Sequence, residues 1–517
     1  MSATTFGGFR LDSILARAAQ THPQRQGVIF PDAAWTYAEV NDRASRLAGA
    51  LARLGVQKGD RVALWIPNRP EFVETLFGVS KLGAIAVLMD FWWTWDDALA
   101  ALGQTRPKVL LVGASQATLA SAHGDAIANC GIEQVLYLED APAGCSFGSY
   151  ANLVNSATPI RQLTPVQPKD PAVIFFTSGS TGRSKGAIHT HSSLIAAATT
   201  MCLELGLQDG ERTLHFLPLF TSCMEHLIPL TLMRATHVIL PKFDAGSVWE
   251  AVHQHSITHF NSIPTTLRRI LDIAPETIPA SLRLISYASE RMPTPLITAL
   301  MERMPKVRFV QFYGMTEQLC LTVLDHSDHL RKIGTIGRPM TGAELYLRQP
   351  DADIQVASGA GEIVGRSPTL FAGYWQDEAA TAQVMLDGWL RTGDLGHFDE
   401  DGFLTLDGRA KEMIKSGGHT VVPSEVEGIL TEHPGVSEAA VVGIPDDRWG
   451  EAVHAFVITN PGVSISEADL KLFCKERLAS YKTPKVIHVV KELPKTGIGK
   501  IARRQVRDQI LALLETA

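Results

Sequence analysis

The stretch FFTSGSTGRSKGAIHTH, Phe175–His191, joins an apolar run to a loop rich in glycine, hydroxyl groups and positive charge. The apolar residues 172–176 predict a buried strand that ends at this loop. Glycines have no Cβ, which lets backbone N–H groups turn inward around an anion. This composition favours a polyphosphate ligand, and the alternative is a loop that binds nothing. The candidate phosphate-binding residues are Thr177, Ser178, Gly179, Ser180, Thr181, Gly182 and Lys185.

The loop departs from the P-loop of nucleotide hydrolases. In that motif Gly-Lys-Ser/Thr opens a helix and places a hydroxyl on magnesium. Here Lys185 follows Ser184 and precedes Gly186, and the strand-like residues 187–189 come before any helix. The sequence therefore disfavours a kinase or NTPase.

Length and composition indicate an ordinary globular protein with a small-molecule ligand. A chain of 517 residues exceeds what one core usually holds, so we expect two or more domains. Its 45% hydrophobic and 20% charged residues are typical of globular proteins. A net charge of −7 gives no reason to expect a nucleic-acid partner.

The cysteines and the N-terminal sequence indicate the cellular compartment in which we expect the protein. Six cysteines are scattered without CxxC or Cys/His spacing, which predicts reduced thiols rather than a zinc site or disulfides. Residues 1–13 do not resemble a signal peptide, and no apolar run reaches the length of a membrane span. We expect a cytoplasmic protein with no membrane span.

Helix-like and strand-like segments alternate along the first part of the chain. Thr36 with Glu39 predicts a capping box at the start of a helix that runs to about residue 54. Such alternation predicts an α/β fold with parallel strands. The other segments are helices over 11–21 and 71–82 and strands over 27–30, 61–66 and 84–89.

The pattern of expected secondary structure changes at two points in the second part of the chain. A turn-rich region from Gly334 to about Gly408 predicts a small β subdomain, and an α+β unit begins beyond Lys411 with a capped helix at Pro423. We therefore expect a large N-terminal domain, 1–410, of α/β layers plus the small β subdomain. A smaller α+β C-terminal domain, 411–517, would follow.

Three further clusters could carry chemistry, although each alone could be a turn, a cap or a solvated charge. Residues 311–317, QFYGMTE, end a strand with an aromatic ring that can stack on a base and a carboxylate that can hold magnesium. Residues 389–394, WLRTGD, supply a carboxylate suited to the hydroxyls of a ribose. Residues 494–500, PKTGIGK, place a lysine at the end of a flexible loop.

Taken in order, these motifs give the whole chain a resemblance to the adenylate-forming superfamily of acyl-CoA synthetases, free-standing adenylation domains and luciferases. The resemblance implies two steps: a carboxylate attacks the α-phosphate of ATP, giving an acyl-adenylate and pyrophosphate, and a thiol then displaces AMP. Charge neutralisation and positioning would supply most of the catalysis. The matching segments are TSGSTGRSKG, YGMTE, GEIVGRSPTLFAGYW, WLRTGDLG, GRAKEMIKSGGHTVVPSEVE and PKTGIGK.

The resemblance assigns roles around the phosphates. Residues 177–182 and Lys185 would wrap the β- and γ-phosphates. Thr316 would contact the α-phosphate, and Glu317 would hold Mg²⁺. Lys500 would bridge the carboxylate and phosphate oxygens during adenylation, which suits a mobile point charge.

It also assigns roles around the nucleoside. Tyr313 would stack on adenine, with Gln311 near the amino group of the base. Gly314, the next residue after Tyr313, would belong to the same nucleotide-binding site. Asp394 would bind the ribose hydroxyls, with Arg409 close by.

For the second step the resemblance implies a mobile C-terminal domain. Lys411 falls at the expected hinge. The domain would carry Lys500 in for adenylation and then present Ser416, Gly417 and Gly418 beside a tunnel for the pantetheine of CoA, where glycines let a narrow chain pass close to the backbone.

The acid-binding segments depart from the family pattern. Phe220 is followed by Thr221, where many such synthetases have histidine. Residues 287–292, YASERM, which include Ser289, Glu290 and Arg291, depart from a small, glycine-rich sequence. Glu290 and Arg291 could pair with each other or read a polar tail of the substrate. The acid itself is left open, between an aromatic acid and a modest acyl chain with a polar end.

Two features near these segments have open interpretations. The aromatic residues at 91–95, FWWTW, could line a substrate cavity, although large aromatics more often serve packing. His226 cannot be assumed to replace the missing histidine, because a lone histidine is more often structural.

The leading hypothesis is an ATP-dependent acid–CoA ligase. One alternative is an adenylating enzyme that loads the pantetheine arm of a carrier protein, with the same chemistry and a different acceptor. A second alternative is an ATP-binding regulator without catalysis, which the presence of Lys500 disfavours. An amino-acid-activating enzyme would usually have an aspartate after Phe220, and residues 221–223 offer none.

Overall fold

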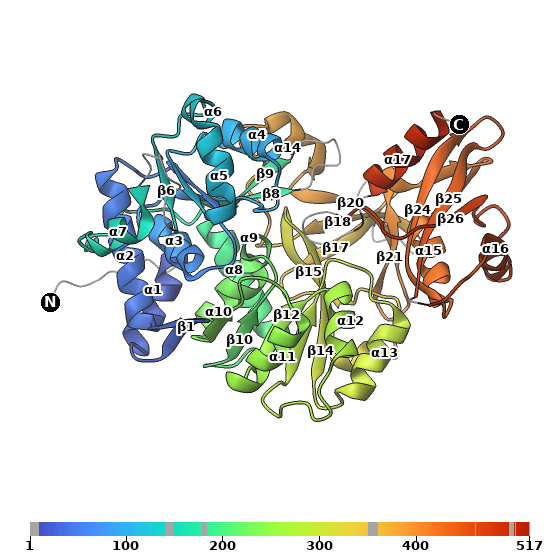
Figure 1. Cartoon of the computed structure of the whole chain (residues 1–517), viewed down its shortest axis with the longest axis horizontal. Coiled ribbons are helices and arrows are strands. Elements are labelled where there is room, and N and C mark those ends of the chain that lie inside the picture. The colour runs from blue at the N-terminus through green and yellow to red at the C-terminus, as the bar shows by residue number, and fades with distance from the viewer. Residues whose placement is uncertain are drawn as a thin grey trace.

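The computed structural model describes residues 10–139, 148–177, 184–349, 360–460, 462–495, 501 and 503–515. Two large sheets and their helices form the greater part of the chain, and a small sheet joins them to a separate C-terminal unit at the red end of the colour scale (Figure 1). The predicted fold, α/β layers with a small β subdomain and a smaller α+β domain, is confirmed.

The first large sheet has seven strands, and all neighbouring pairs are parallel except β8 and β9, which are antiparallel. Two neighbouring strands near its middle, β3 and β4, are apolar and buried over residues 62–65 and 85–88, as parallel strands covered on both faces require. In sheet order the strands are β7 (Gly148–Ser149), β6 (Gln134–Tyr137), β5 (Val109–Val112), β3 (Arg61–Trp65), β4 (Ile85–Leu88), β8 (Pro171–Thr177) and β9 (Lys185–Thr190).

The second large sheet has nine strands, with a parallel centre and antiparallel pairs at both edges. Parallel strands end at the same edge of a sheet, and ligands of α/β proteins bind at that edge. In sheet order the strands are β16 (Arg338–Pro339), β15 (Gln318–Leu324), β14 (Arg308–Met315), β13 (Leu284–Tyr287), β12 (His259–Ser262), β10 (Arg212–His215), β11 (Thr236–Ile239), β1 (Gln26–Phe30) and β2 (Ala33–Thr36).

Helices cover both large sheets (Figure 1). The predicted capping box is present: the Thr36 hydroxyl accepts from the Glu39 N–H, and the Glu39 carboxylate accepts from the Thr36 N–H. These helices are α1 (Leu11–Thr21), α2 (Tyr37–Arg53), α3 (Pro70–Lys81), α4 (Trp95–Thr105), α5 (Ala114–Ala122), α6 (Gly124–Asn129), α7 (Tyr150–Asn155), α8 (His191–Glu204), α9 (Leu219–Ser222), the π-helical turn η1 (Cys223–Leu227), α10 (Ile228–Leu232), α11 (Ala245–Gln254), α12 (Pro264–Asp272) and α13 (Thr294–Arg303).

The small sheet contains the WLRTGD motif on its longest strand. Its elements are β17 (Glu344–Arg348), β18 (Ala360–Arg366), α14 (Glu378–Val384), β19 (Met385–Leu386), β20 (Trp389–Phe398) and β21 (Leu404–Arg409), and short 3₁₀ turns, η2 (His326–Asp328) and η3 (Ala410–Glu412), lie before and after it.

The C-terminal unit packs helices against a mixed sheet. Its first helix begins at Pro423 as predicted, but Val422 precedes it and supplies no side-chain cap. Proline is favoured at the first helical position because its missing N–H would have no partner there. The elements are β22 (Ile414–Ser416), β23 (His419–Val421), α15 (Pro423–Glu432), β24 (Val436–Asp446), β25 (Gly450–Thr459), α16 (Glu467–Lys475), β26 (Val486–Val489) and α17 (Arg503–Glu515).

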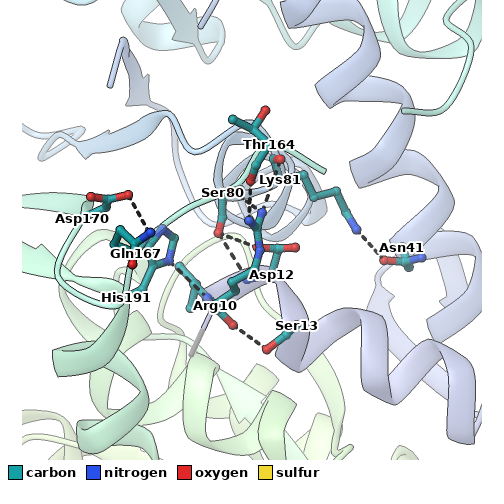
Figure 2. Close-up of polar contacts among 11 residues, drawn as sticks. Arg10, Asp12, Ser13, Asn41, Ser80, Lys81, Thr164, Gln167, Asp170 and His191 are labelled. Atoms are coloured by element: carbon teal, nitrogen blue, oxygen red, sulfur yellow. Dashed lines mark hydrogen bonds and ion pairs between the residues drawn. The ribbon is translucent and has the colours of Figure 1, made fainter. Parts of the chain in front are cut away.

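A buried polar network joins the start of α1 to the start of α8 (Figure 2). Arg10 Nε bonds the Asp12 carboxylate at 3.0 Å, and Arg10 Nη1 donates to the Thr164 carbonyl at 2.5 Å. The Leu11 N–H donates to Nδ1 of His191, the first residue of α8, at 3.2 Å. Burial lowers the pKa of His191 to about 4, so its neutral ring can accept this bond. The network anchors the start of α8 and therefore the end of β9.

The described cysteines, at 130, 202, 223, 320 and 474, are free thiols, as expected. No helix within the described ranges has the length and apolar character needed to cross a membrane.

Candidate active site

Two adjoining cavities lie where the central strands of the nine-stranded sheet end. The larger, which we call the Tyr313 cavity, has a volume of about 260 Å³. The smaller, the Phe220 cavity, has a volume of about 180 Å³. The two share a wall, which consists of Ser289, Phe312, Gly314 and Met315.

Gly314 is required at this wall by close packing. A Cβ at this position would lie 2.9 Å from the Cys320 nitrogen and 3.2 Å from the Gln318 carbonyl, closer than side-chain atoms normally approach backbone. The hairpin between β14 and β15 can therefore close only around a glycine. The following residues, Thr316 and Glu317, form the turn of that hairpin.

The Tyr313 cavity brings together residues from two motifs that are about 80 positions apart in the chain. The Tyr313 hydroxyl donates to Asp394 Oδ2 at 2.6 Å, and Arg409 Nε lies 3.1 Å from Asp394 Oδ1. Burial, and after it the Asp394 carboxylate, raises the pKa of Tyr313, so the phenol stays protonated and donates. A carboxylate accepts about four hydrogen bonds, so Asp394 keeps capacity for a ligand. Gln311 and Gly314 also line this cavity.

Gln311 belongs to a chain of polar groups that the sequence did not reveal. The Tyr287 hydroxyl lies 3.3 Å from Gln311 Oε1 and 2.8 Å from His329 Nε2. His329 Nδ1 lies 2.7 Å from the Asp325 carbonyl. Burial lowers the pKa of His329 to about 4, so this imidazole is neutral near pH 7. The chain fixes the Gln311 amide on the cavity wall.

The two ends of the glycine-rich loop lie side by side. Thr177 ends β8 and pairs with Lys185, which begins β9. Five of the predicted phosphate-binding residues, Ser178, Gly179, Ser180, Thr181 and Gly182, lie outside the described residues.

Lys185, Glu317 and Tyr374 meet although they are far apart in sequence. Lys185 Nζ lies 5.1 Å from the centroid of the Tyr374 ring, and the Tyr374 hydroxyl donates to Glu317 Oε1 at 2.5 Å. The segment that carries Tyr374 is held in place by backbone bonds, from Phe371 N–H to the Glu317 carbonyl at 2.8 Å and from Trp375 N–H to the Gly186 carbonyl at 2.7 Å. Tyr374 lies inside the matched segment GEIVGRSPTLFAGYW, so that motif was the signal that could have identified it.

Thr316 lines the Phe220 cavity, and a buried histidine fixes its backbone. His189 Nε2 lies 2.7 Å from the Thr316 carbonyl. Burial lowers the pKa of His189 to about 4, so the ring is neutral and its Nε2–H donates to this carbonyl. Strand β9, which begins directly after the glycine-rich loop in the sequence, thus holds the turn that carries Thr316 and Glu317.

The Phe220 cavity contains three of the five residues predicted for the acid, namely Phe220, Thr221 and Ser289. Phe220 packs edge-on against Phe91, with ring centroids 5.6 Å apart, and lies 6.4 Å from the Trp92 ring. Phe91 and Trp92, from the aromatic residues at 91–95, therefore pack against this wall. His226 is not at the cavity; it is buried with Nε2 2.8 Å from the Thr213 hydroxyl.

Glu290 and Arg291 lie on the Tyr313 cavity instead. Ser289 adopts a positive φ of 75°, which turns the chain after the shared wall. Glu290 accepts from the N–H and hydroxyl of Thr265 at 3.2 and 2.7 Å. Arg291 donates to the Ser424 carbonyl at 3.1 Å and so contacts the C-terminal unit.

The residues predicted for the second step line neither cavity. Ser416, Gly417 and Gly418 form the tight turn between β22 and β23, and both glycines have positive φ, 59° and 80°. A Cβ at Gly417 would lie 2.9 Å from the Trp449 ring. Lys411 lies in η3, directly after the small sheet. Lys500 lies outside the described residues.

Comparisons with known proteins agree on one family. The profile of the AMP-binding enzyme family matches residues 15–375, and that of the AMP-binding enzyme C-terminal domain matches residues 425–500. Long-chain-fatty-acid–CoA ligase FadD13 of Mycobacterium tuberculosis is 32% identical over 515 residues, 96% of this chain and 98% of the relative. Feruloyl-CoA synthase of Amycolatopsis sp is 35% identical over 503 residues, with coverage of 96% and 98%.

Solved structures give the same result. O-succinylbenzoate CoA synthetase (MenE) from Bacillus subtilis, in complex with the acyl-adenylate intermediate, superposes with a TM-score of 0.85 at 30% identity. The match covers 96% of this chain and 98% of that one. The same enzyme is known in complex with ATP and magnesium ion.

Proposed function

This chain belongs to the AMP-binding enzyme family, and on that premise we propose that its two joined cavities activate a carboxylic acid with ATP and pass the acyl group to CoA. The class predicted from the sequence, an AMP-forming acid–CoA ligase, is confirmed by relatives of that class along almost the whole chain. The finer assignments below, residue by residue, are our proposal.

The wall that the two cavities share supports their assignment to one active site. The Tyr313 cavity offers groups suited to a nucleoside, and the Phe220 cavity offers an apolar space suited to an acyl group. Thr316 lines the Phe220 cavity directly after the shared residues Gly314 and Met315. An α-phosphate held at Thr316 would therefore meet a carboxylate that enters from the other side, and adenylation requires this approach of two anions.

In this proposal each group keeps its predicted role. Adenine stacks on Tyr313 with Gln311 at its edge, and Asp394 with Arg409 holds the ribose. Lys185 and the loop residues 177–182 hold the β- and γ-phosphates. Lys500 neutralises the carboxylate and α-phosphate oxygens, arriving with the C-terminal domain, 411–517.

The residues present fit Mg²⁺ at Glu317. This ion is usually held by one or two carboxylates together with substrate phosphates. Tyr374 fixes Glu317 Oε1, and Oε2 has no hydrogen-bond partner among the residues that the structure describes. No group of three or more His, Cys, Asp or Glu side chains in those ranges could hold a metal alone, which agrees with an ion shared with the nucleotide. When bound, the ion would neutralise phosphate charge.

Product analysis tests this function. The purified protein is incubated with Mg-ATP and a panel of carboxylic acids, with and without CoA. We expect acid-dependent release of pyrophosphate and a new acyl-CoA mass. An acyl-adenylate that persists with CoA and is consumed only by a pantetheinylated carrier protein would show that the acceptor is the carrier protein and not CoA. No adenylate with any acid would favour the non-catalytic regulator.

A further inference from the structure

Asn261 is a nearly buried amide on the wall of the Phe220 cavity. It lies on strand β12, lines this cavity and keeps only 4% of its surface exposed. Its side-chain oxygen Oδ1 lies 3.1 Å from the Ser286 hydroxyl, whereas its NH₂ group has no hydrogen-bond partner among the residues that the structure describes. An unpaired donor in a buried place costs free energy, so a ligand that accepts from this NH₂ group would be stabilised.

The neighbours of Asn261 determine which end of its amide is free. His259 Nε2 lies 3.0 Å from the Ser286 hydroxyl, and its buried Nδ1 has no partner within the described ranges. Burial lowers the pKa of His259 to about 3, so the ring is neutral and carries one proton. Because an unpaired buried N–H is rare, that proton belongs on Nε2, which donates to Ser286. The Ser286 hydroxyl then donates to Asn261 Oδ1 and leaves the NH₂ group for a ligand.

Other polar groups of the cavity are already used within the protein. The hydroxyls of Thr221 and Ser222 both donate to the Pro218 carbonyl, at 3.1 and 2.9 Å. No lysine, arginine or histidine is among the described residues that line this cavity. A second carboxylate on the acid would therefore enter without a cationic partner, and burial of an unpaired charge is costly. An uncharged acceptor avoids this cost.

The strand register separates Asn261 from the place assigned to the reacting carboxylate. Asn261 is in register with Ser286 on β13, and Ser286 is in register with Val310 on β14. Thr316 comes only after the far end of β14, at Met315. Asn261 is thus displaced from Thr316 both across the sheet and along the strands. An acid whose carboxylate meets the α-phosphate at Thr316 therefore directs its tail towards Asn261.

The volume of the Phe220 cavity limits that tail. At about 180 Å³ it is smaller than typical sites for drug-sized ligands, which span about 300–1,000 Å³. A cavity of about 150 Å³ is known to accept benzene. The space beyond the reacting carboxylate therefore fits about one aromatic ring or a short aliphatic chain.

We propose that the Phe220 cavity selects compact acids whose tail carries an uncharged hydrogen-bond acceptor, a keto oxygen or a ring nitrogen, which binds the NH₂ group of Asn261. The inference rests on the proposed function, because it assigns this cavity to the acid. An apolar tail would exclude water from the NH₂ group and leave it unpaired. A site built to hydrogen-bond a ligand rejects the analogue that lacks the bond.

Matched acids test the proposal. Benzoate is compared with nicotinate and isonicotinate, in which a nitrogen replaces one ring CH, and 4-methylpentanoate is compared with 4-oxopentanoate. Terephthalate supplies a charged acceptor. kcat/KM is measured from pyrophosphate release with Mg-ATP and CoA at about pH 8, where the ring nitrogens are unprotonated. In the series that the enzyme uses faster, we expect an acceptor-bearing acid to exceed its plain analogue at least about 10-fold. Terephthalate should be the poorest acid.

Two variants connect the preference to Asn261. Asn261→Leu removes the donor at similar size, so the preference should fall below about 2-fold while the KM for ATP stays unchanged. Asn261→Asp replaces the donor with an acceptor, so the acceptor-bearing acids should become poorer than their plain analogues. Asn155→Leu, at an exposed asparagine on α7, is the matched control and should keep the wild-type preference.

The failures are separable. Pyrophosphate release that does not favour the acceptor-bearing acids, or that occurs only with acids larger than this panel, would overturn this inference and keep the ligase. An acceptor preference that survives in both Asn261 variants would do the same. No release with any acid would overturn the ligase and this inference together.

Discussion

The Tyr313 cavity and the Phe220 cavity share a wall, but different interactions shape them. In the first, fixed polar contacts join Tyr313, Asp394 and Arg409. In the second, aromatic packing of Phe220 on Phe91 and Trp92 shapes an apolar space. The first should bind the same nucleotide whatever the acid, and the second should set the choice of acid. Changes to one cavity should therefore leave the function of the other intact.

Lys500→Ala should have the largest effect, because the Lys500 charge is proposed to neutralise the carboxylate and α-phosphate oxygens as they approach each other. Removing one group that stabilises transition-state charge costs about 10²–10³ in rate. We expect that loss in adenylate formation, with thioester formation from a supplied acyl-adenylate spared. Lys495→Ala, which breaks only a surface pair with Glu438, is the control. Equal losses in both half-reactions would remove the assigned role.

Glu317→Ala should come next, at about 10²-fold for adenylation, because a carboxylate ligand of the phosphate-bound ion is lost. Raising the Mg²⁺ concentration should recover part of the rate. The measurement is a Mg²⁺ titration of pyrophosphate release, with the exposed pair residue Glu344→Ala as control. Unchanged activity at low Mg²⁺ would take Glu317 out of the site.

Asp394→Ala should raise the KM for ATP equally for every acid. It leaves the Tyr313 hydroxyl and Arg409 without their partner, and an unsatisfied buried polar group costs about 1–3 kcal/mol, a factor of about 10–100. Steady-state kinetics with several acids measure this, and Asp401→Ala at the surface is the control. A KM for ATP that changed with the acid would contradict the claim that the Tyr313 cavity binds the nucleotide independently of the acid.

Tyr374→Phe should cost about 10-fold, since it removes one hydrogen bond to a charged carboxylate, worth about 1.5–3 kcal/mol. Tyr374 is a positioning residue, so the loss should appear as a weaker response to Mg²⁺ rather than to the acid. If the Mg²⁺ dependence stays that of the wild type, Tyr374 acts only in packing.

Phe220→Leu should have the smallest effect on ATP, less than 2-fold in KM, while it changes the ranking of acids towards bulkier tails. Pocket substitutions of this size typically change discrimination by about 1–3 kcal/mol. Competition between acid pairs measures the ranking, and the exposed Leu203→Ala is the control. A large change in the KM for ATP with no change in the ranking of acids would contradict the assignment of ATP to the Tyr313 cavity and of the acid to the Phe220 cavity.

The sequence predicted the Tyr313 cavity better than the Phe220 cavity for a physical reason. Tyr313 and Asp394 lie in short motifs on strands β14 and β20, where backbone geometry fixes the direction of the side chains. The wall of the Phe220 cavity consists of residues from five or more separate elements, so its shape depends on packing that no motif records. Glu225 also lines the Phe220 cavity without any signal in the sequence, because it lies in the π-helical turn η1.

Glu290 and Arg291 illustrate the same limit. They adjoin Ser289 in sequence, but the positive φ of Ser289 directs them to the other cavity. His329 carried no sequence signal at all, since its role depends on a contact with Tyr287, 42 residues away. The boundary between residues 410 and 411 and the hinge at Lys411 stay predictions.

The most direct test is a crystal structure of the protein with a non-hydrolysable acyl-adenylate analogue, an acyl sulfamate of adenosine. We expect adenine on Tyr313, ribose hydroxyls on Asp394, the sulfamate at Thr316 and the acyl tail in the Phe220 cavity. A tail lodged outside the Phe220 cavity, or adenine bound away from Tyr313, would contradict this expectation.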